Sequence, residues 1–201
     1  MRCSTVEMRW FLPGPVPLSV LDWFGSLGPG LAAPAPRTDR YLLLPGRDDL
    51  GIKLREGRLE IKGRTAELGI HRLGSRAIGE VETWCKWSLA SEEVPEAWCK
   101  WSLASEEVPE ALRVLDANPA LGVPVHKDRA LRMLEGCQVE VTALEAPFGV
   151  WWTLGLEALT GPEPALAPLV SVGEHVLGDF PDRLGERDSR SYPGWLVAHT
   201  P

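Results

Sequence analysis

Residues 51–64 read GIKLREGRLEIKGR, and this stretch decides the fold. Leu and Ile residues alternate with Lys, Arg and Glu on both sides of a Glu-Gly step, which is the period-two pattern of a β-hairpin. A two-residue turn at 56–57 sets the register of the hairpin. The predicted facing pairs are Arg55 with Arg58, Leu54 with Leu59, Lys53 with Glu60 and Ile52 with Ile61. One face of the hairpin is then wholly apolar, and the other carries the charges.

The same alternation recurs along the chain, which predicts a mainly antiparallel β-protein. Near the start, Glu7 and Arg9 alternate with apolar residues, and further on Glu82 and Lys86 share one face of a strand. Because successive side chains of a strand point to opposite faces, each of these stretches has one charged and one apolar side. The strand-like stretches are residues 6–11, 39–44, 51–64, 80–89, 123–134, 137–146 and 150–159.

The remaining segments complete the expected architecture. Residues 17–28 and 173–180 suit short helices, and residues 161–172 read as a loop with three prolines. Residues 123–134 either stay extended or pass into a helical turn. About seven or eight strands with a few short helices make an α+β fold, and residues 1–201 have the size of a single domain with one core.

Residues 84–97 and 98–111 are the same fourteen residues, WCKWSLASEEVPEA, repeated without a difference. Repeat folds need about three or more units, so the pair indicates either a recent tandem duplication or an artefact of sequence assembly rather than a repeat architecture. Pro95 comes shortly before the second copy, and a proline inside a strand removes a ladder donor. We therefore expect the first copy to form the strand and the second to be an additional loop, arm or helical segment.

Composition excludes several classes of protein. The formal net charge is -7, whereas nucleic-acid binding depends on a basic surface. No apolar run approaches the ~20 residues of a membrane span, and the start lacks a leader pattern, so we expect a cytoplasmic protein with no membrane partner. Cys85 and Cys99 are copies of one position, and with Cys3 and Cys137 they make no CxxC pair. Neither a zinc site nor a disulfide framework is expected.

The charged faces of the predicted strands admit two interpretations. They are either the solvated outer faces of a sheet or the inner faces of a barrel with a polar lumen. Lys and Arg recur at alternate positions in three strands, where like charges repel unless an anion bridges them. Carboxylates among them would suit a divalent cation. Polyphosphate with Mg²⁺ or Mn²⁺ is a ligand that needs both kinds of side chain.

Seven motifs, taken in chain order, resemble the CYTH family, the triphosphate tunnel metalloenzymes. They are VEMRWF (6–11), DRYLLL (39–44), GIKLREGRLEIKGR (51–64), GEVETWCKWSL (79–89), VHKDR (125–129), WWTLGLEA (151–158) and SYPGWL (191–196). The resemblance implies an eight-stranded antiparallel tunnel barrel with short helices packed outside. Its interior would bind a triphosphate.

The resemblance also implies site residues. The family's N-terminal E-x-E-x-K falls on Thr5, Glu7 and Arg9, and its late E-x-E falls on Gly155 and Glu157, so one acid of each motif is absent. The expected substrate-binding residues are Arg9, Lys53, Arg55, Lys62, Lys127 and Arg129, with Lys86 added from the charged face of its strand. The expected metal ligands are Glu7 and Glu157, with Glu82 and Glu140 as further carboxylates; Glu7 and Glu157 are also the catalytic candidates.

Three functions remain open from the sequence. The first is binding of a triphosphate or similar small phosphorylated anion with divalent-metal-dependent hydrolysis, in which water attacks in line while basic side chains neutralise the phosphates. The second is a non-catalytic polyanion-binding module that has lost part of the metal site, as Thr5 and Gly155 suggest. The third is a barrel without a tunnel ligand that acts through its surface. The identity of the anion and the oligomeric state also stay open.

Overall fold

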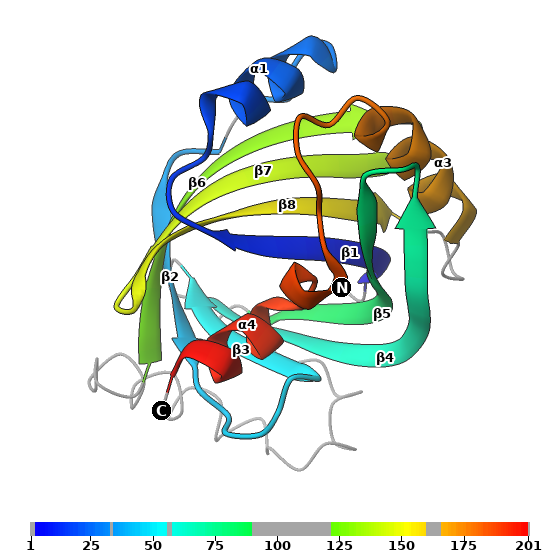
Figure 1. Ribbon diagram of the computed structural model, residues 1–201. Helices are drawn as coiled ribbons and strands as arrows, with labels where there is room; N and C mark the ends of the chain where they lie inside the picture. Colours follow the sequence, from blue (N-terminus) through cyan, green and yellow to red (C-terminus); the bar gives the residue numbers. More distant parts are fainter. Residues whose placement is uncertain (1–2, 33, 56–57, 90–121, 160–165, 201) are drawn as a thin grey trace.

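In the described part of the chain, eight strands close into an antiparallel barrel (Figure 1). The computed structural model describes residues 3–32, 34–55, 58–89, 122–159 and 166–200. The strands are β1 (Cys3–Pro13), β2 (Arg37–Leu42), β3 (Leu50–Arg55), β4 (Arg58–Leu73), β5 (Ala77–Leu89), β6 (Gly122–Leu134), β7 (Cys137–Ala146) and β8 (Gly149–Leu159). Their order around the barrel is β1-β5-β4-β3-β2-β6-β7-β8, and β8 pairs with β1 to close it. The predicted fold class is confirmed.

The β3–β4 hairpin has the predicted register. Lys53 pairs with Glu60, and the other three predicted pairs are found as well. β4 continues far beyond the hairpin, and its pairing with β5 shifts register after Arg64 and again after Glu67. Such irregularities bend a strand, and Figure 1 shows β4 turning a corner on its way round the barrel. The hairpin therefore supplies a regular charged face, and the extension of β4 supplies curvature.

The first copy of the repeat contributes to the barrel. Its residues 84–89 lie in β5, which pairs with β4 on one side and β1 on the other. This agrees with the expectation that the first copy forms a strand. The second copy, residues 98–111, lies outside the described residues, so the expectation for it stays a prediction.

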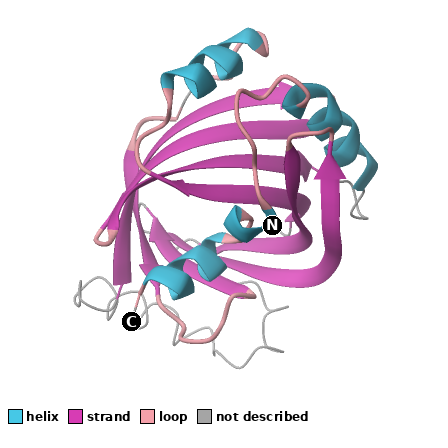
Figure 2. Cartoon of the chain, viewed as in Figure 1, coloured by secondary structure: helices cyan, strands magenta, loops and turns pink. Residues whose placement is uncertain are grey.

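The main apolar core lies between the outer face of the barrel and two helices. Val6, Met8 and Trp10 in β1 point outward and are buried against α1 (Leu18–Ser26) and α3 (Leu166–Leu177). Figure 2 shows these two helices outside the sheet. None of the described helices is long and apolar enough to cross a membrane.

The structure corrects one local expectation and decides another. Residues 161–172 were predicted as a loop, but α3 already begins at Leu166. Pro168 lies in its first turn, where a backbone N–H has no partner within the helix, so the proline costs no hydrogen bond there. Residues 123–134, for which a helical turn was left open, are strand throughout.

A third helix, α4 (Tyr192–His199), lies across one mouth of the barrel (Figure 1). Its Trp195 is fully buried and stacks on Phe11, with ring centroids 4.9 Å apart. Phe11 is on the same face of β1 as Glu7 and Arg9, so this second core closes one end of the lumen.

The segment before α4 contacts β1, where Ser189 forms an isolated bridge with Trp10. The short 3-10 helix η3 (Glu186–Asp188) precedes this bridge. One residue later the backbone N–H of Arg190 donates to the carbonyl of Arg9. These contacts fix the chain as it approaches the mouth.

Replacement of Trp195 by Ala is expected to lower the free energy of unfolding by about 3–5 kcal/mol, because it removes a buried indole and leaves a cavity. Urea denaturation followed by circular dichroism measures this. Leu18→Ala is the matched control: Leu18 is 78% exposed on α1, and its truncation should change stability by less than about 0.5 kcal/mol. Equal stabilities of the Trp195 variant and the wild type would show that α4 does not hold the barrel closed.

Candidate functional site

A cavity of about 150 Å³ lies in the lumen of the barrel and gathers most of the predicted site residues. The predicted substrate-binding residues that line it are Arg9, Lys53, Arg55, Lys62, Lys86, Lys127 and Arg129. The predicted acids that line it are Glu7, Glu140 and Glu157. Glu82 lines an adjoining chamber of about 40 Å³ instead. The structure thus brings these side chains together, and their roles in binding or catalysis stay predictions.

The pleat of the strands explains the convergence. Alternate residues of a strand face the same side, so each predicted strand contributes its charged face to the lumen. Eight basic and four acidic side chains line the larger cavity. The interior is therefore positive although the chain has a formal net charge of -7. A concave site with one sign of charge concentrates ions of the opposite sign.

Asp39 is an acid of the lumen wall that the sequence analysis did not single out. It is fully buried, and its carboxylate accepts from Lys53 Nζ at 2.8 Å and Arg37 Nε at 3.1 Å, with Lys127 Nζ at 3.4 Å. Burial acts to raise the pKa of Asp39, but the charges of Lys127 and Lys53 outweigh it and hold the pKa below its ordinary range. The signal was present in Arg37-Thr38-Asp39-Arg40-Tyr41, where every second residue faces the lumen.

Glu60 likewise neutralises basic side chains, on another part of the cavity wall. Its carboxylate lies 3.1 Å from Lys53 Nζ, 3.2 Å from Lys86 Nζ and 3.4 Å from Arg55 Nη1. Lys86 is directly paired with Lys62 across β4 and β5, and like charges in such a position repel. The carboxylates of Asp39 and Glu60 therefore offset the repulsion among these basic side chains when no ligand is bound.

Lys127 lies deepest among the basic residues. It is 4% exposed, and its ammonium group donates to the Tyr41 hydroxyl at 2.6 Å and sits 3.7 Å from the centroid of the Tyr192 ring. Burial and the neighbouring charge of Lys53 lower the pKa of Lys127 well below its ordinary value. Tyr41 and Tyr192 were not predicted as site residues. The pattern of β2 could have indicated Tyr41, but no local pattern indicates that Tyr192 reaches the lumen from α4.

Both carboxylate oxygens of Glu140 are bound by basic side chains. Its oxygens accept from Arg9 Nη1 at 2.7 Å, from Thr142 at 2.9 Å and from the guanidinium of Arg129. Burial acts to raise its pKa, but Arg9 and Arg129 outweigh burial, so the pKa of Glu140 lies below its ordinary range. A cation at this carboxylate would have to displace an arginine.

Glu7 and Glu157 are cross-strand neighbours in the β1–β8 pair. Glu7 accepts from Thr5 and from Lys62. Within the described residues, Glu157 has no ion pair, and burial together with the charge of Glu7 raises its pKa. Two carboxylates facing each other in this way repel, and a shared cation would relieve the repulsion.

The four predicted metal ligands differ in how well they fit a divalent cation. Among the described residues, no group of three or more acid, His or Cys side chains is arranged to hold a metal. Glu82 is held by Arg64 Nη1 at 2.6 Å and by Trp84 Nε1 at 3.0 Å, and Glu140 is held by two arginines. The pair Glu7 and Glu157 fits better, because Mg²⁺ binds with one or two carboxylates completed by phosphate oxygens and water.

Comparisons with known proteins give no family for the chain. No family model matches it, and no curated protein is similar to it at a significant level.

Several solved structures match the chain at low similarity. One is that of a candidate adenylate cyclase from Bacillus halodurans, with a TM-score of 0.47 and 14% identity over 90% of this chain and 93% of that one. The RNA triphosphatase Pct1 of S. pombe matches with a TM-score of 0.41 and 11% identity over 88% of this chain and 82% of that one. The same enzyme in complex with the Spt5 CTD matches at 0.39 and 8%, over 87% and 75%. At these values we draw no conclusion from the likeness, and the barrel is established by its own strand pairing.

Proposed function

We propose that the protein binds inorganic tripolyphosphate, or a closely related chain of phosphate groups, in the lumen of the barrel. The observation that carries the proposal is that basic side chains from six strands converge on one cavity of a protein that is acidic as a whole. A surplus of cations held together at least partly out of water is costly unless an anion compensates it. Such a surplus is therefore best explained by a polyanionic ligand.

The arrangement of the bases suits a chain of phosphates better than a single anion. Neighbouring strands lie about 4.8 Å apart, so Lys62 and Lys86 enter the lumen from adjacent positions of the wall, one toward Glu7 and the other toward Glu60. Arg9, Arg55 and Arg129 add guanidinium groups, which bind phosphate oxygens in a forked geometry. Linked phosphate groups carry negative charge at each link and can contact all of these donors at once.

Hydrolysis is the fuller form of this proposal. Glu7 and Glu157 would hold one divalent cation, which supplies charge neutralisation at the phosphate and activates water. In this arrangement Glu157 is positioned to orient a water molecule, since within the described residues no basic side chain pairs with it. Lys53 and Arg55, on the opposite side of the cavity, would hold the remainder of the phosphate chain.

A non-catalytic binding module is the second candidate. Thr5 and Gly155 carry no carboxylate, and both Glu82 and Glu140 are held by arginines. Each of these features reduces the number of oxygens available to a cation, whereas none of them reduces the number of phosphate donors. Binding and hydrolysis must therefore be measured separately.

Anion binding is tested by titration calorimetry with inorganic tripolyphosphate. Lys53→Gln and Arg55→Gln should each weaken binding by about tenfold or more, because each removes a charged hydrogen bond worth roughly 1.5–3 kcal/mol. Arg47→Gln is the control, since Arg47 is exposed and paired with Asp49 away from the lumen. Equal affinities for all three variants and the wild type would refute binding in the lumen.

Hydrolysis is tested by phosphate release from tripolyphosphate in the presence of Mg²⁺ or Mn²⁺. Glu157→Gln should reduce the rate by at least about a hundredfold, because metal catalysis is worth several kcal/mol, while tripolyphosphate binding persists. No release from a folded wild type that binds the anion would favour the binding module.

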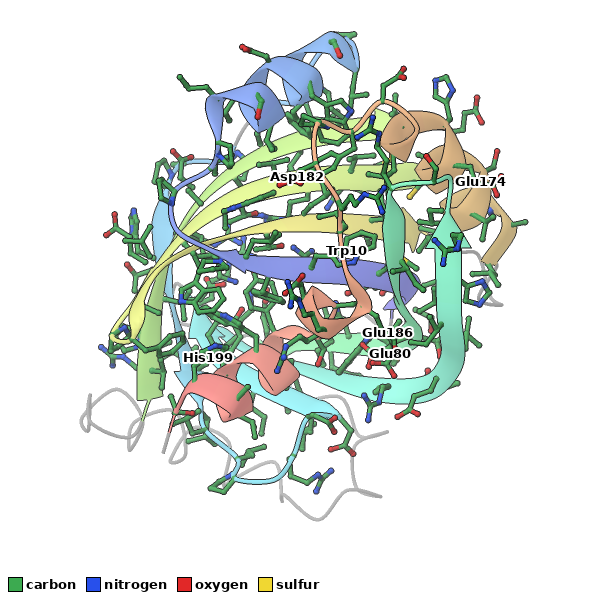
Figure 3. The ribbon with its side chains drawn as sticks, viewed as in Figure 1. Trp10, Glu80, Glu174, Asp182, Glu186 and His199 are labelled. Carbon is green, nitrogen blue, oxygen red and sulfur yellow. The ribbon has the colours of Figure 1, made fainter. Side chains whose placement is uncertain are left out.

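The same variant tests the electrostatics of the unliganded site. Because the pKa of Glu157 is raised in the folded state, its ionisation destabilises the fold as the pH rises above the ordinary value of 4.5. Glu157→Gln should therefore increase the melting temperature, and more at pH 8 than at pH 4.5. Glu174→Gln, on the exposed side of α3 (Figure 3), removes a charge outside the lumen and should show no such pH dependence. A lower melting temperature of Glu157→Gln at pH 8 would contradict the raised pKa.

A further inference from the structure

Gly155 in β8 lies directly beneath the side chain of Arg9 in β1. The two residues are cross-strand partners. A Cβ atom on Gly155 would lie 2.6 Å from Arg9 Cζ, 2.6 Å from Nη2 and 2.8 Å from Nη1. These nearly equal distances mean that the guanidinium lies flat on the glycine. The backbone of Gly155 is not in the left-handed region, so what the glycine provides here is room and not an unusual conformation.

The Arg9 guanidinium beside Gly155 is held by hydrogen bonds from one of its nitrogen atoms. Arg9 Nη1 donates to Glu140 at 2.7 Å and to Thr153 at 2.8 Å, and the Tyr192 ring centroid is 5.1 Å from Cζ. Nε and Nη2 donate to none of the described residues. Arg9 is 9% exposed and lines both the cavity and the adjoining chamber, so its side chain borders the space where a ligand would lie.

Arg9 occupies a part of the lumen wall where nearby carboxylates attract positive charge. The side chain is attracted by Glu140 and by Glu7, which raise its already high pKa against the effect of burial. A divalent cation at Glu140 would have to approach a fixed guanidinium of the same sign, because Arg9 and Arg129 already neutralise that carboxylate. The site therefore contains its own counter-charge for a phosphate group.

We propose that Gly155 is a positioning residue, which seats Arg9 as a permanent cation in the lumen wall so that a phosphate chain binds without a divalent cation. The inference rests on the proposed function and makes it specific. Arg9 contacts the phosphate through Nε and Nη2, and Gly155 acts only through Arg9. A Cβ at position 155 would lie below 3.0 Å from three atoms of the guanidinium, so the end of the Arg9 side chain would have to shift from the position it holds here.

The test is calorimetric titration of the full chain with inorganic tripolyphosphate, in EDTA and in Mg²⁺. Wild type should bind in EDTA, with affinities in the two buffers within about threefold of each other. Arg9→Gln and Gly155→Ala should each bind about tenfold or more weakly in EDTA, because a charged hydrogen bond is lost. The double variant should bind no more weakly than Arg9→Gln alone, since both changes remove the same contact. Added Mg²⁺ should restore binding in these variants more than it improves wild type.

Gly63→Ala is the matched control. Gly63 is a strand glycine in β4, and its Cβ would meet nothing nearer than 3.4 Å, so its binding should equal that of wild type. Thermal melts establish that each variant is folded; if Gly155→Ala does not fold, Arg9→Gln decides, because it adds no atoms to the site. Loss of wild-type binding in EDTA, or wild-type affinity in Arg9→Gln or folded Gly155→Ala, would overturn the inference while leaving lumen binding intact. A wild type that binds tripolyphosphate in neither buffer would overturn both proposals.

Discussion

Buried charges in a closed barrel require compensation at close range, because a charged group removed from water loses far more free energy than one contact returns. In this lumen each main acid neutralises several bases. Asp39 forms ion pairs with Lys53, Lys127 and Arg37, and Glu140 forms ion pairs with two arginines. The bases still outnumber the acids that line the cavity. The folded state depends on carboxylates that each contact several basic side chains. The proposed function depends on the positive charge that these carboxylates do not neutralise.

The same pairing limits what the carboxylates can do. An acid that holds two cations in place has little capacity left for a metal ion, as Glu82 and Glu140 show. The neighbouring acids Glu7 and Glu157 repel each other, and a cation placed between them would relieve that repulsion. Under the proposed function the lumen holds an anion mainly through its basic side chains, and metal chemistry would be confined to the pair Glu7 and Glu157.

Much of the fold could be predicted because it depends on local pattern. Period-two alternation identified the strands and the register of residues 51–64, since a two-residue turn leaves one way to pair them. The same alternation placed the charged residues on one side of each strand, but it did not decide whether that side faces solvent or the lumen, which the closed barrel shows. The α3 boundary was missed because a proline in the first turn of a helix resembles a loop proline.

The site was less predictable, because it depends on partners distant in sequence. Tyr192 reaches the lumen only through the packing of α4 across the mouth, and nothing in residues 191–196 indicates that destination. Gly155 appeared in the sequence as an absent acid. In the structure it is the space that Arg9 occupies, which only the β1–β8 pairing reveals.

The pairing of β1 with β8 has a consequence for synthesis of the chain. β1 ends at Pro13, whereas its partner begins at Gly149, and ribosomes add about 5–20 residues per second. The residues of β1 are therefore synthesised on the order of ten seconds before those of β8. During that time Val6, Met8 and Trp10, which are buried in the finished protein, have neither β8 nor α3 to cover them. Transiently exposed apolar surface and unpaired strand edges favour association, so the interval between synthesis of β1 and synthesis of α3 is the period in which association through this strand is most favoured.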